Sequence, residues 1–156
     1  MYGRMYTASV GAVAVSAVQD LIEVNAPADS VVIIHAIYLG QTSDVGDAAE
    51  EILQVQITRS TGSAGSGGST PTARPMQVGD AAYGGGAIQF NNTTQAGSTT
   101  VLHEDAFNIR VGWQYLPPPE QRIIISPSGV LVIELPVQPS DEITMDISVV
   151  LEEIGG

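Results

Sequence analysis

The sequence contains no cysteine and no lysine, and each absence excludes a class of protein. Without cysteine the chain can form neither a disulfide framework nor a thiolate zinc site. Its only permanently cationic side chains are 5 arginines, which face 17 acidic residues and leave a formal net charge of −12. Because such a surface repels phosphate backbones and anionic lipids, we expect no nucleic-acid partner and no membrane partner.

Charged and aromatic residues are also scarce, at 14% and 5% of the chain, and long apolar runs are missing. No run of about eighteen apolar residues occurs, so we expect no membrane-spanning helix. The mildly apolar residues 1–18 are interrupted by Ser9, Gly11 and Ser16, which argues against a secretory signal. A length of 156 residues fits a single domain that can bury a large core without covalent cross-links.

Short apolar runs separated by glycine, proline, serine and asparagine are typical of an all-β domain. We therefore predict a single-domain β-sandwich, jelly-roll-like, with eight to ten strands and at most one short helix near residues 44–51. The helix is suggested by Asp47 and Glu50, which have the spacing of a weak capping box. The predicted strands are residues 6–18, 20–24, 31–39, 53–58, 88–90, 100–103, 108–116, 121–125, 130–135 and 143–151.

Two of these strands have informative patterns. Residues 31–39 are apolar at nearly every position, which predicts a central strand that is covered on both faces. Residues 143–151 alternate strictly, which predicts that one face lies on the core. The opposite face, with Asp146 and Glu152, is expected to lie in water.

The ends of the predicted domain are set by composition. Residues 1–10 are expected to form an N-terminal arm that becomes ordered only against a neighbouring molecule, and residues 11–156 form the sandwich. The domain carries a long glycine- and serine-rich loop at residues 61–75, which we interpret as a flexible surface excursion. Its segment 62–69 superficially resembles a phosphate-binding loop but lacks the required lysine.

The sequence offers two possible metal sites, and the spacing disfavours both. His35 and His103 could form a two-histidine, one-carboxylate site with Glu104 or Asp105, but neighbouring residues of a strand point to opposite faces. The simpler interpretation is a core or interface histidine at His35 and a turn residue at His103.

The acidic residues Asp44, Asp47, Glu50 and Glu51 lack the spacing of a calcium-binding loop, so a solvated loop with a helix cap is favoured. No serine or carboxylate pair stands out as catalytic, and we therefore expect no catalytic residue, no cofactor and no metal site.

Trp113 and Tyr115 are the aromatic residues most open to a functional interpretation. They have the same strand parity, so both side chains should lie on one face and could form a platform for a sugar. Such a pair is more often part of a core or a subunit interface, and we favour that interpretation.

Several stretches of the sequence are similar to small proteins of tailed bacteriophages. The most specific is residues 40–51, and the similarity extends over nearly the whole chain. The other matching stretches are residues 6–8, 13–15, 19–21, 65–68, 91–94, 103–108 and 112–115. On these stretches the chain resembles the capsid decoration, or cement, proteins of tailed bacteriophages.

The resemblance implies a non-enzymatic virion protein that binds the outer surface of the phage head and stabilises it by bridging subunits of the major capsid protein. It implies synthesis in the bacterial cytoplasm and assembly as a homo-oligomer. A trimer or dimer would cover Tyr38, Trp113 and Tyr115 in part. The alternatives are a carbohydrate- or receptor-binding module of a phage tail or fibre and a metalloenzyme that uses the two histidines.

Overall fold

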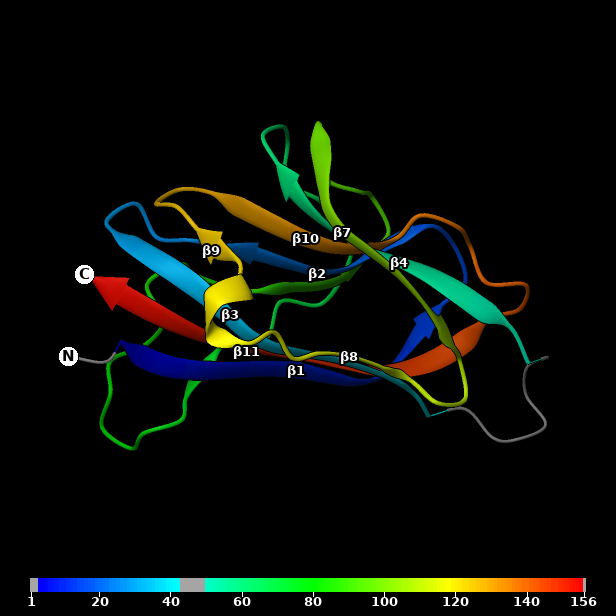
Figure 1. The fold of residues 1–156 in the computed structure, drawn as a ribbon, viewed down its shortest axis with the longest axis horizontal. Helices are drawn as coiled ribbons and strands as arrows, with labels where there is room; N and C mark the ends of the chain where they lie inside the picture. Colours follow the sequence, from blue (N-terminus) through cyan, green and yellow to red (C-terminus); the bar gives the residue numbers. More distant parts are fainter. Residues whose placement is uncertain (1–2, 43–49, 156) are drawn as a thin grey trace.

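The short apolar runs form eleven strands across the residues that the computed structural model describes, 3–42 and 50–155. The strands make two antiparallel sheets that face each other (Figure 1). The first sheet contains β1 (Arg4–Val15), β3 (Ser30–Gln41), β5 (Arg74–Pro75), β8 (Trp113–Tyr115), β9 (Ile124–Ile125) and β11 (Ile143–Gly155). The second contains β2 (Gln19–Asn25), β4 (Ile52–Ser60), β6 (Gln89–Asn92), β7 (Thr99–Asn108) and β10 (Val130–Leu135).

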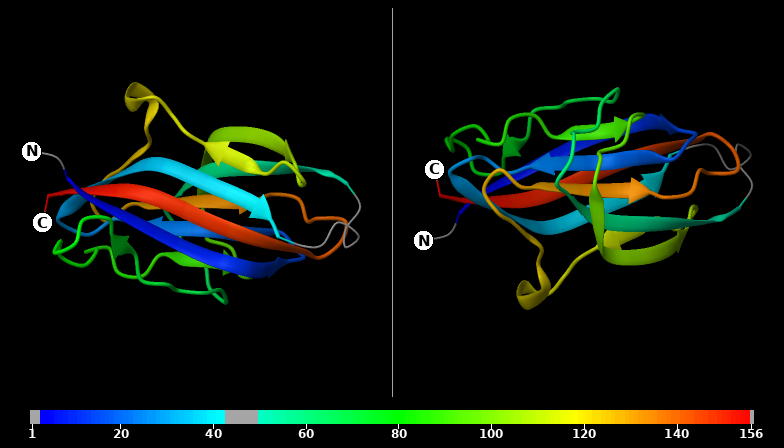
Figure 2. Two further views of the ribbon diagram at one scale, coloured as in Figure 1. Left: turned by 90° about the horizontal axis from the view of Figure 1, so that it is seen from below. Right: turned by 90° about the horizontal axis from the view of Figure 1, so that it is seen from above.

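The strand order is that of a jelly roll. The first sheet runs β5-β1-β11-β3-β8, with β9 also paired to β3, and the second runs β6-β2-β10-β4-β7. Without the short β5, β6 and β9, eight strands remain in two sheets of four, β1-β11-β3-β8 and β2-β10-β4-β7. Figure 2 shows the first sheet in front in one view and the second in the other. The predicted β-sandwich is confirmed.

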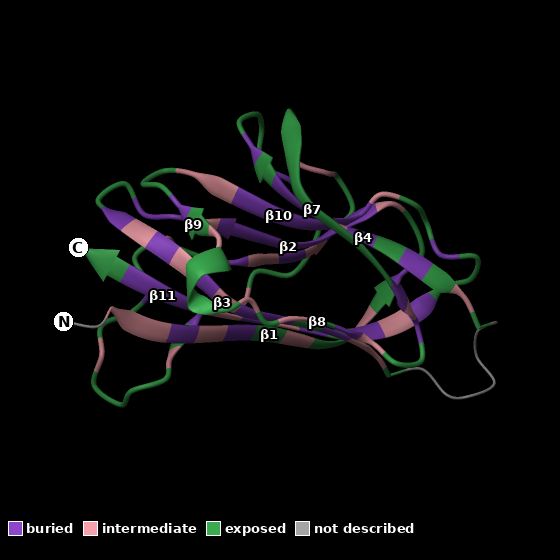
Figure 3. Cartoon of the chain, viewed as in Figure 1, coloured by how far each residue is buried: buried purple, intermediate pink, exposed green. Residues whose placement is uncertain are grey.

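The core lies between the sheets and is filled by alternate residues of the long strands (Figure 3). β11 has the predicted alternation, because its inward side chains are all buried. These are Ile143, Met145, Ile147, Val149 and Leu151. On its other face Asp146 is exposed as expected, whereas Glu152 is buried. Glu152 accepts hydrogen bonds from the Gly3 amide at 2.7 Å and forms a 2.8 Å contact with His35 Nε2, which explains the difference.

The prediction for residues 31–39 is half right. β3 is an inner strand of its sheet, between β11 and the two short strands β8 and β9. Only its inward face is fully buried, however, and the outward residues Val31, Ile33 and His35 are half-buried while Tyr38 is exposed. The second sheet covers only one face of β3. A strand that is apolar at nearly every position is therefore not necessarily buried on both faces.

The expected N-terminal arm is wrong for residues 4–10. These residues begin β1, which pairs with β11 from Arg4 opposite Glu153 onward. Tyr6 is fully buried in the core, and its hydroxyl donates to the Ala81 carbonyl at 2.9 Å. The small residues of this strand are explained by its place between β11 and β5 rather than by flexibility.

Replacing Tyr6 should therefore destabilise the domain itself. We expect Tyr6→Ala to lower the free energy of unfolding by about 3–5 kcal/mol, because it empties a large buried site. The exposed Ser9 of the same strand is the control, and Ser9→Ala should change stability by about 0.5 kcal/mol or less. Urea unfolding followed by circular dichroism measures both. Equal stabilities of the two variants would contradict this role of Tyr6 and would support the hypothesis of a detached N-terminal arm.

The long connection between β4 and β7 lies along one side of the sandwich. Its β5 extends the first sheet beyond β1, and its β6 extends the second sheet beyond β2. The glycine-rich part forms bridges between Ser66 and Thr94 and between Ser69 and Phe90. Gly68 packs so closely on β6 that an added Cβ would lie 2.0 Å from the Phe90 carbonyl oxygen. Here glycine permits a close backbone approach.

This contact makes Gly68 sensitive to the smallest substitution. Gly68→Ala should lower the free energy of unfolding by about 1–3 kcal/mol, because the β6 backbone has to move away. Gly40→Ala is the matched control, since a Cβ there meets no atom within 4 Å. Thermal unfolding of the two variants measures this difference in stability. If Gly68→Ala were as stable as Gly40→Ala, the glycine-rich segment would not be packed closely on β6.

Two further predictions differ from the structure or lie beyond it. The strand expected over residues 108–116 is divided, because Asn108 accepts backbone hydrogen bonds from Val111 and Gly112, and Gly112 has a φ of 79°. The predicted helix near 44–51 falls mostly on residues 43–49, outside the described residues. Within the described ranges the only helical element is the 3-10 turn η1 (Pro119–Gln121), and no helix there is long and apolar enough to cross a membrane.

Candidate binding surface

The side of the sandwich opposite the β4–β7 connection is formed by the edge strands β7 and β8. In the described part of the chain β7 pairs only with β4. Its first eight residues are all exposed (Figure 3), which is unusual for a ten-residue strand. β8 has only three residues and is followed by three prolines. A long exposed edge strand is a natural place for another chain to bind.

Aromatic side chains from the two sheets meet at this edge. The rings of Trp113 and Tyr115 are stacked, with centroids 6.1 Å apart, so the predicted shared face is confirmed. The imidazole of His103, from β7, lies 5.4 Å from the Tyr115 ring. Trp113 is only 6% exposed, and an open sugar platform that uses both rings is therefore not formed. Tyr115 remains half-buried at the surface.

Asp105 links β7 to β8 by a hydrogen bond. The Trp113 Nε1–H donates to Asp105 Oδ2 at 3.0 Å, and the Ala106 amide donates to Oδ1 at 2.8 Å. The Trp113 hydrogen bond is the main reason why the pKa of Asp105 lies below its usual value, with smaller contributions from the Ala106 amide and from His103. The Asp105 carboxylate therefore helps to hold the indole of Trp113 in place.

Two shallow hollows lie along this edge and share Leu102 and Ile123. The larger has a volume of about 440 Å³ and contains the aromatic group and the proline segment, and the smaller, of about 110 Å³, is lined by β9 and β10. The smaller hollow is lined mainly by apolar side chains, and Ile124 there is 62% exposed. The larger hollow also contains the polar side chains of His103, Asp105, Gln114 and Gln121. We call this surface the seam and define it by Leu102, His103, Asp105, Trp113, Tyr115, Leu116, Ile123 and Ile124.

The two histidines of the possible metal site do not meet. His35 lies on the first sheet against Glu152, whereas His103 lies within β7 of the second sheet rather than in a turn. Among the described residues no three histidine or acidic side chains are grouped as in a typical metal centre. A two-histidine, one-carboxylate site is therefore not assembled.

Other sequence candidates lie outside the residues that define the seam. Glu50 accepts a hydrogen bond from Asn108 at the end of β7, and Glu51 accepts one from the amide of Ser140 in the loop before β11. Asp44 and Asp47 fall outside the described residues. Tyr38, which is 37% exposed, lines a neighbouring hollow of about 490 Å³ on the outer face of the first sheet. This hollow shares Trp113 and Gln114 with the larger hollow of the seam.

Sequence reasoning missed the apolar part of the seam. The strand pattern predicts only ordinary strands or strand ends at Leu102, Leu116, Ile123 and Ile124. A usable signal was present, because Ile123, Ile124 and Ile125 are consecutive and a strand can bury only one face on a single core. The middle residue of this run, Ile124, is consequently exposed, a few residues after Pro117, Pro118 and Pro119.

Comparison of the chain with models of known protein families, with curated proteins and with solved structures finds no match. The resemblance to phage decoration proteins therefore rests on the short sequence stretches and stays a prediction.

Trp113 is the single tryptophan, so its fluorescence reports on the seam. We expect the emission to change on acidification with a midpoint below 3.8, the usual pKa of the carboxyl, because Asp105 must be protonated to release the indole. The contribution of this hydrogen bond to stability is present above that usual pKa and is lost as the pH falls through the lowered one. Asp105→Asn should abolish the transition and Glu104→Gln should keep it, with circular dichroism checking that the fold persists. A midpoint unchanged in Asp105→Asn would contradict the assignment.

Proposed function

We propose that this chain is a non-enzymatic structural protein of a phage virion. In this proposal it binds the outer surface of the capsid and bridges subunits of the major capsid protein through the seam. The observation that carries the proposal is the apolar, exposed edge formed by β7, β8 and the segment before β9, with Leu102, Leu116 and Ile124 at its rim. An exposed apolar surface on an acidic chain favours a protein partner.

The fold supports an adhesive role. A jelly roll is a rigid support, and its edge can carry an interaction surface without disturbing the core. A decoration protein binds many identical sites, so each contact can be modest because neighbouring contacts raise the effective affinity. In the proposal the protein acts as a homo-oligomer, a trimer or a dimer, on the outer surface of the head. Trp113 is already buried within one chain, so a second protomer could cover Tyr38 or Tyr115 but little of Trp113.

A second candidate is a carbohydrate- or receptor-binding module of a phage tail or fibre. The observation in its favour is the group of three rings formed by Trp113, Tyr115 and His103, since sugars stack on such rings. The burial of Trp113 leaves Tyr115 and His103 as the accessible rings. This second candidate is therefore weaker than the first.

The position of the chain on the particle separates the two candidates. Immunogold labelling of virions produced from the genome that encodes this chain should place gold on the heads. Gold confined to tails or fibres would favour the second candidate. Particles without label would contradict both.

The role of the seam can be tested by adding purified protein to particles that lack it. We expect Leu102→Asp or Ile124→Asp to reduce the affinity at least tenfold, because each places a charge in the apolar part of the contact surface. Val78→Asp is the control, since Val78 is fully exposed in the connection on the opposite side. Occupancy on the particles is read by sedimentation and gel densitometry. Equal binding by all three variants would exclude the seam as the contact surface.

A further inference from the structure

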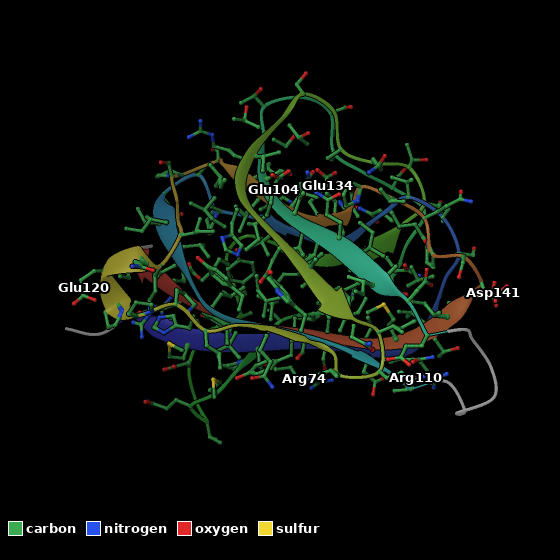
Figure 4. All side chains as sticks on the ribbon, turned by 45° about the vertical axis from the view of Figure 1, so that its right-hand side comes forward. Arg74, Glu104, Arg110, Glu120, Glu134 and Asp141 are labelled. Atoms are coloured by element: carbon green, nitrogen blue, oxygen red, sulfur yellow. The ribbon has the colours of Figure 1, made fainter. Side chains whose placement is uncertain are left out.

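The face of the first sheet that is turned away from the core is open across its middle. Figure 4 shows Arg74 below β1, on the opposite side of the molecule from Glu134. The outer face of the second sheet differs, because the β4–β7 connection covers buried acids there, including Asp20 and Glu23. On the first sheet the corresponding residues, such as Tyr38, are exposed, and a ligand can reach them.

Two hollows on this open face meet at Ser9. The first, of about 490 Å³, contains Tyr38 and Gln114, and the second, of about 300 Å³, lies between β1 and Arg74 of β5. We call the two hollows together the groove. It crosses the sheet in the order β8, β3, β11, β1 and β5. Neighbouring strands lie about 4.8 Å apart, so the groove is about 19 Å long and suits an extended ligand.

Four polar side chains form one row across the middle of the groove. Ser9 lies opposite Ser148 in the strand register, and Ser148 lies opposite Tyr38. Tyr38 in turn lies opposite Gln114. Direct partners in antiparallel strands point to the same face, so all four side chains line the groove. Within the described part of the chain none of the four side chains forms a hydrogen bond with another protein group, and their polar atoms are available to a ligand.

A glycine and a fixed carboxylate lie beside this row. Gly40 is the next residue of β3 on the same face as Tyr38, and it lies opposite Asp146. A Cβ added at Gly40 would meet no atom within 4 Å, so the space beside Tyr38 is left open. Asp146 is exposed, and its Oδ1 accepts a hydrogen bond from the Ala12 amide at 2.7 Å, which holds the carboxylate at the groove.

The chemistry of the groove favours an uncharged sugar chain. Tyr38 is 37% exposed and offers an aromatic ring on which the apolar face of a sugar packs. Sugar hydroxyls donate to Asp146 and accept from Arg74, which forms no ion pair within the described residues. The net charge of −12 disfavours an anionic ligand. A protein segment is also disfavoured, because the centre of a protein interface is usually apolar and this row is polar.

We propose that the groove binds an extended, neutral oligosaccharide. The ring of Tyr38 stacks on one sugar unit, and the other polar side chains of the row bind hydroxyl groups of that unit and its neighbours. Asp146 accepts from hydroxyl groups beside Tyr38, and Arg74 donates to a unit at the far end. The inference goes beyond the proposed virion function and does not rest on it, because none of these side chains is among those that define the seam.

Binding to sugars is tested on the intact chain. A printed array of neutral and acidic bacterial oligosaccharides selects the sugar, and native gels that contain dextran, laminarin or galactomannan test longer neutral chains. Isothermal titration with the selected oligosaccharide then gives the Kd. We expect retention by neutral chains and a lower Kd for an oligosaccharide than for its monosaccharide, because the groove spans five strands. Binding to no sugar, or to acidic sugars alone, would overturn the proposal.

Variants locate the sugar. Tyr38→Ala removes the ring and Gly40→Leu fills the open space beside it, so each should raise the Kd at least tenfold. Tyr115→Ala makes the same change among the rings of the seam and should leave the Kd within about twofold, with circular dichroism checking each fold. Sugar binding that is lost in Tyr115→Ala and kept in Tyr38→Ala would overturn the proposal. So would a wild-type protein that binds no sugar and a Gly40→Leu protein that has lost self-association in light scattering, since a second protomer would then cover this face.

Nuclear magnetic resonance supplies a measurement that needs no variant. The selected oligosaccharide is titrated into ¹⁵N-labelled protein, and the shifts of the backbone amide signals are followed. We expect the largest changes at Ser9, Tyr38, Gly40 and Ser148, because these residues line the first hollow. Changes confined to residues 102–105 of the seam would contradict the site even if Tyr38→Ala or Gly40→Leu failed to fold.

Discussion

The pairing of β11 with both β1 and β3 is the interaction on which the rest of the structure depends. It joins Arg4 to Glu153 and Val31 to Ile154, so the two ends of the chain share one sheet. Closing such a long loop is entropically costly, and the inward side chains of β11, fully buried from Ile143 to Leu151, provide the compensating apolar burial. The same register brings Glu152 against His35 and the Gly3 amide. Residues 4–15 are therefore part of the domain.

A jelly roll has four sheet edges, two on each side of the sandwich. In this chain the edges on one side are extended by further strands, and those on the other side are not. On one side the β4–β7 connection adds β5 beside β1 and β6 beside β2, and it covers the buried acids of the second sheet. On the other side β7 and β8 end the sheets without further strands in the described residues. Exposed edges of this length are normally shortened, bulged or charged to prevent association. β7 has one bulge, near Leu102, and the two acids Glu104 and Asp105, and it keeps apolar residues beside them.

The local part of this architecture could be predicted from the sequence, and the long-range part could not. Alternation identified the strands and the inward face of β11, because that signal lies within a few residues. The burial of Glu23 and Glu152 was not foreseen. An acid in an alternating strand is expected to face water, and only a distant segment such as Gly65 or Gly3 decides otherwise. The same reason explains why the composition of residues 1–10 suggests an arm, since the strand that pairs with β1 is β11, far away in the sequence.

The electrostatics of the two sides constrain how the molecule can associate. Because the net charge is −12, copies of this chain repel one another, and the chain also repels any acidic partner. In the proposed contact, attraction at the seam comes from its apolar side chains and from Arg59, a permanent cation that lines the smaller hollow. Screening by salt weakens this repulsion and leaves the apolar contribution intact, so the proposed self-association through the seam should strengthen as ionic strength rises. Binding to nucleic acid or anionic lipid has the opposite dependence, because there salt removes the attraction itself. The distribution of charge, more than the jelly roll, therefore restricts the class of partner.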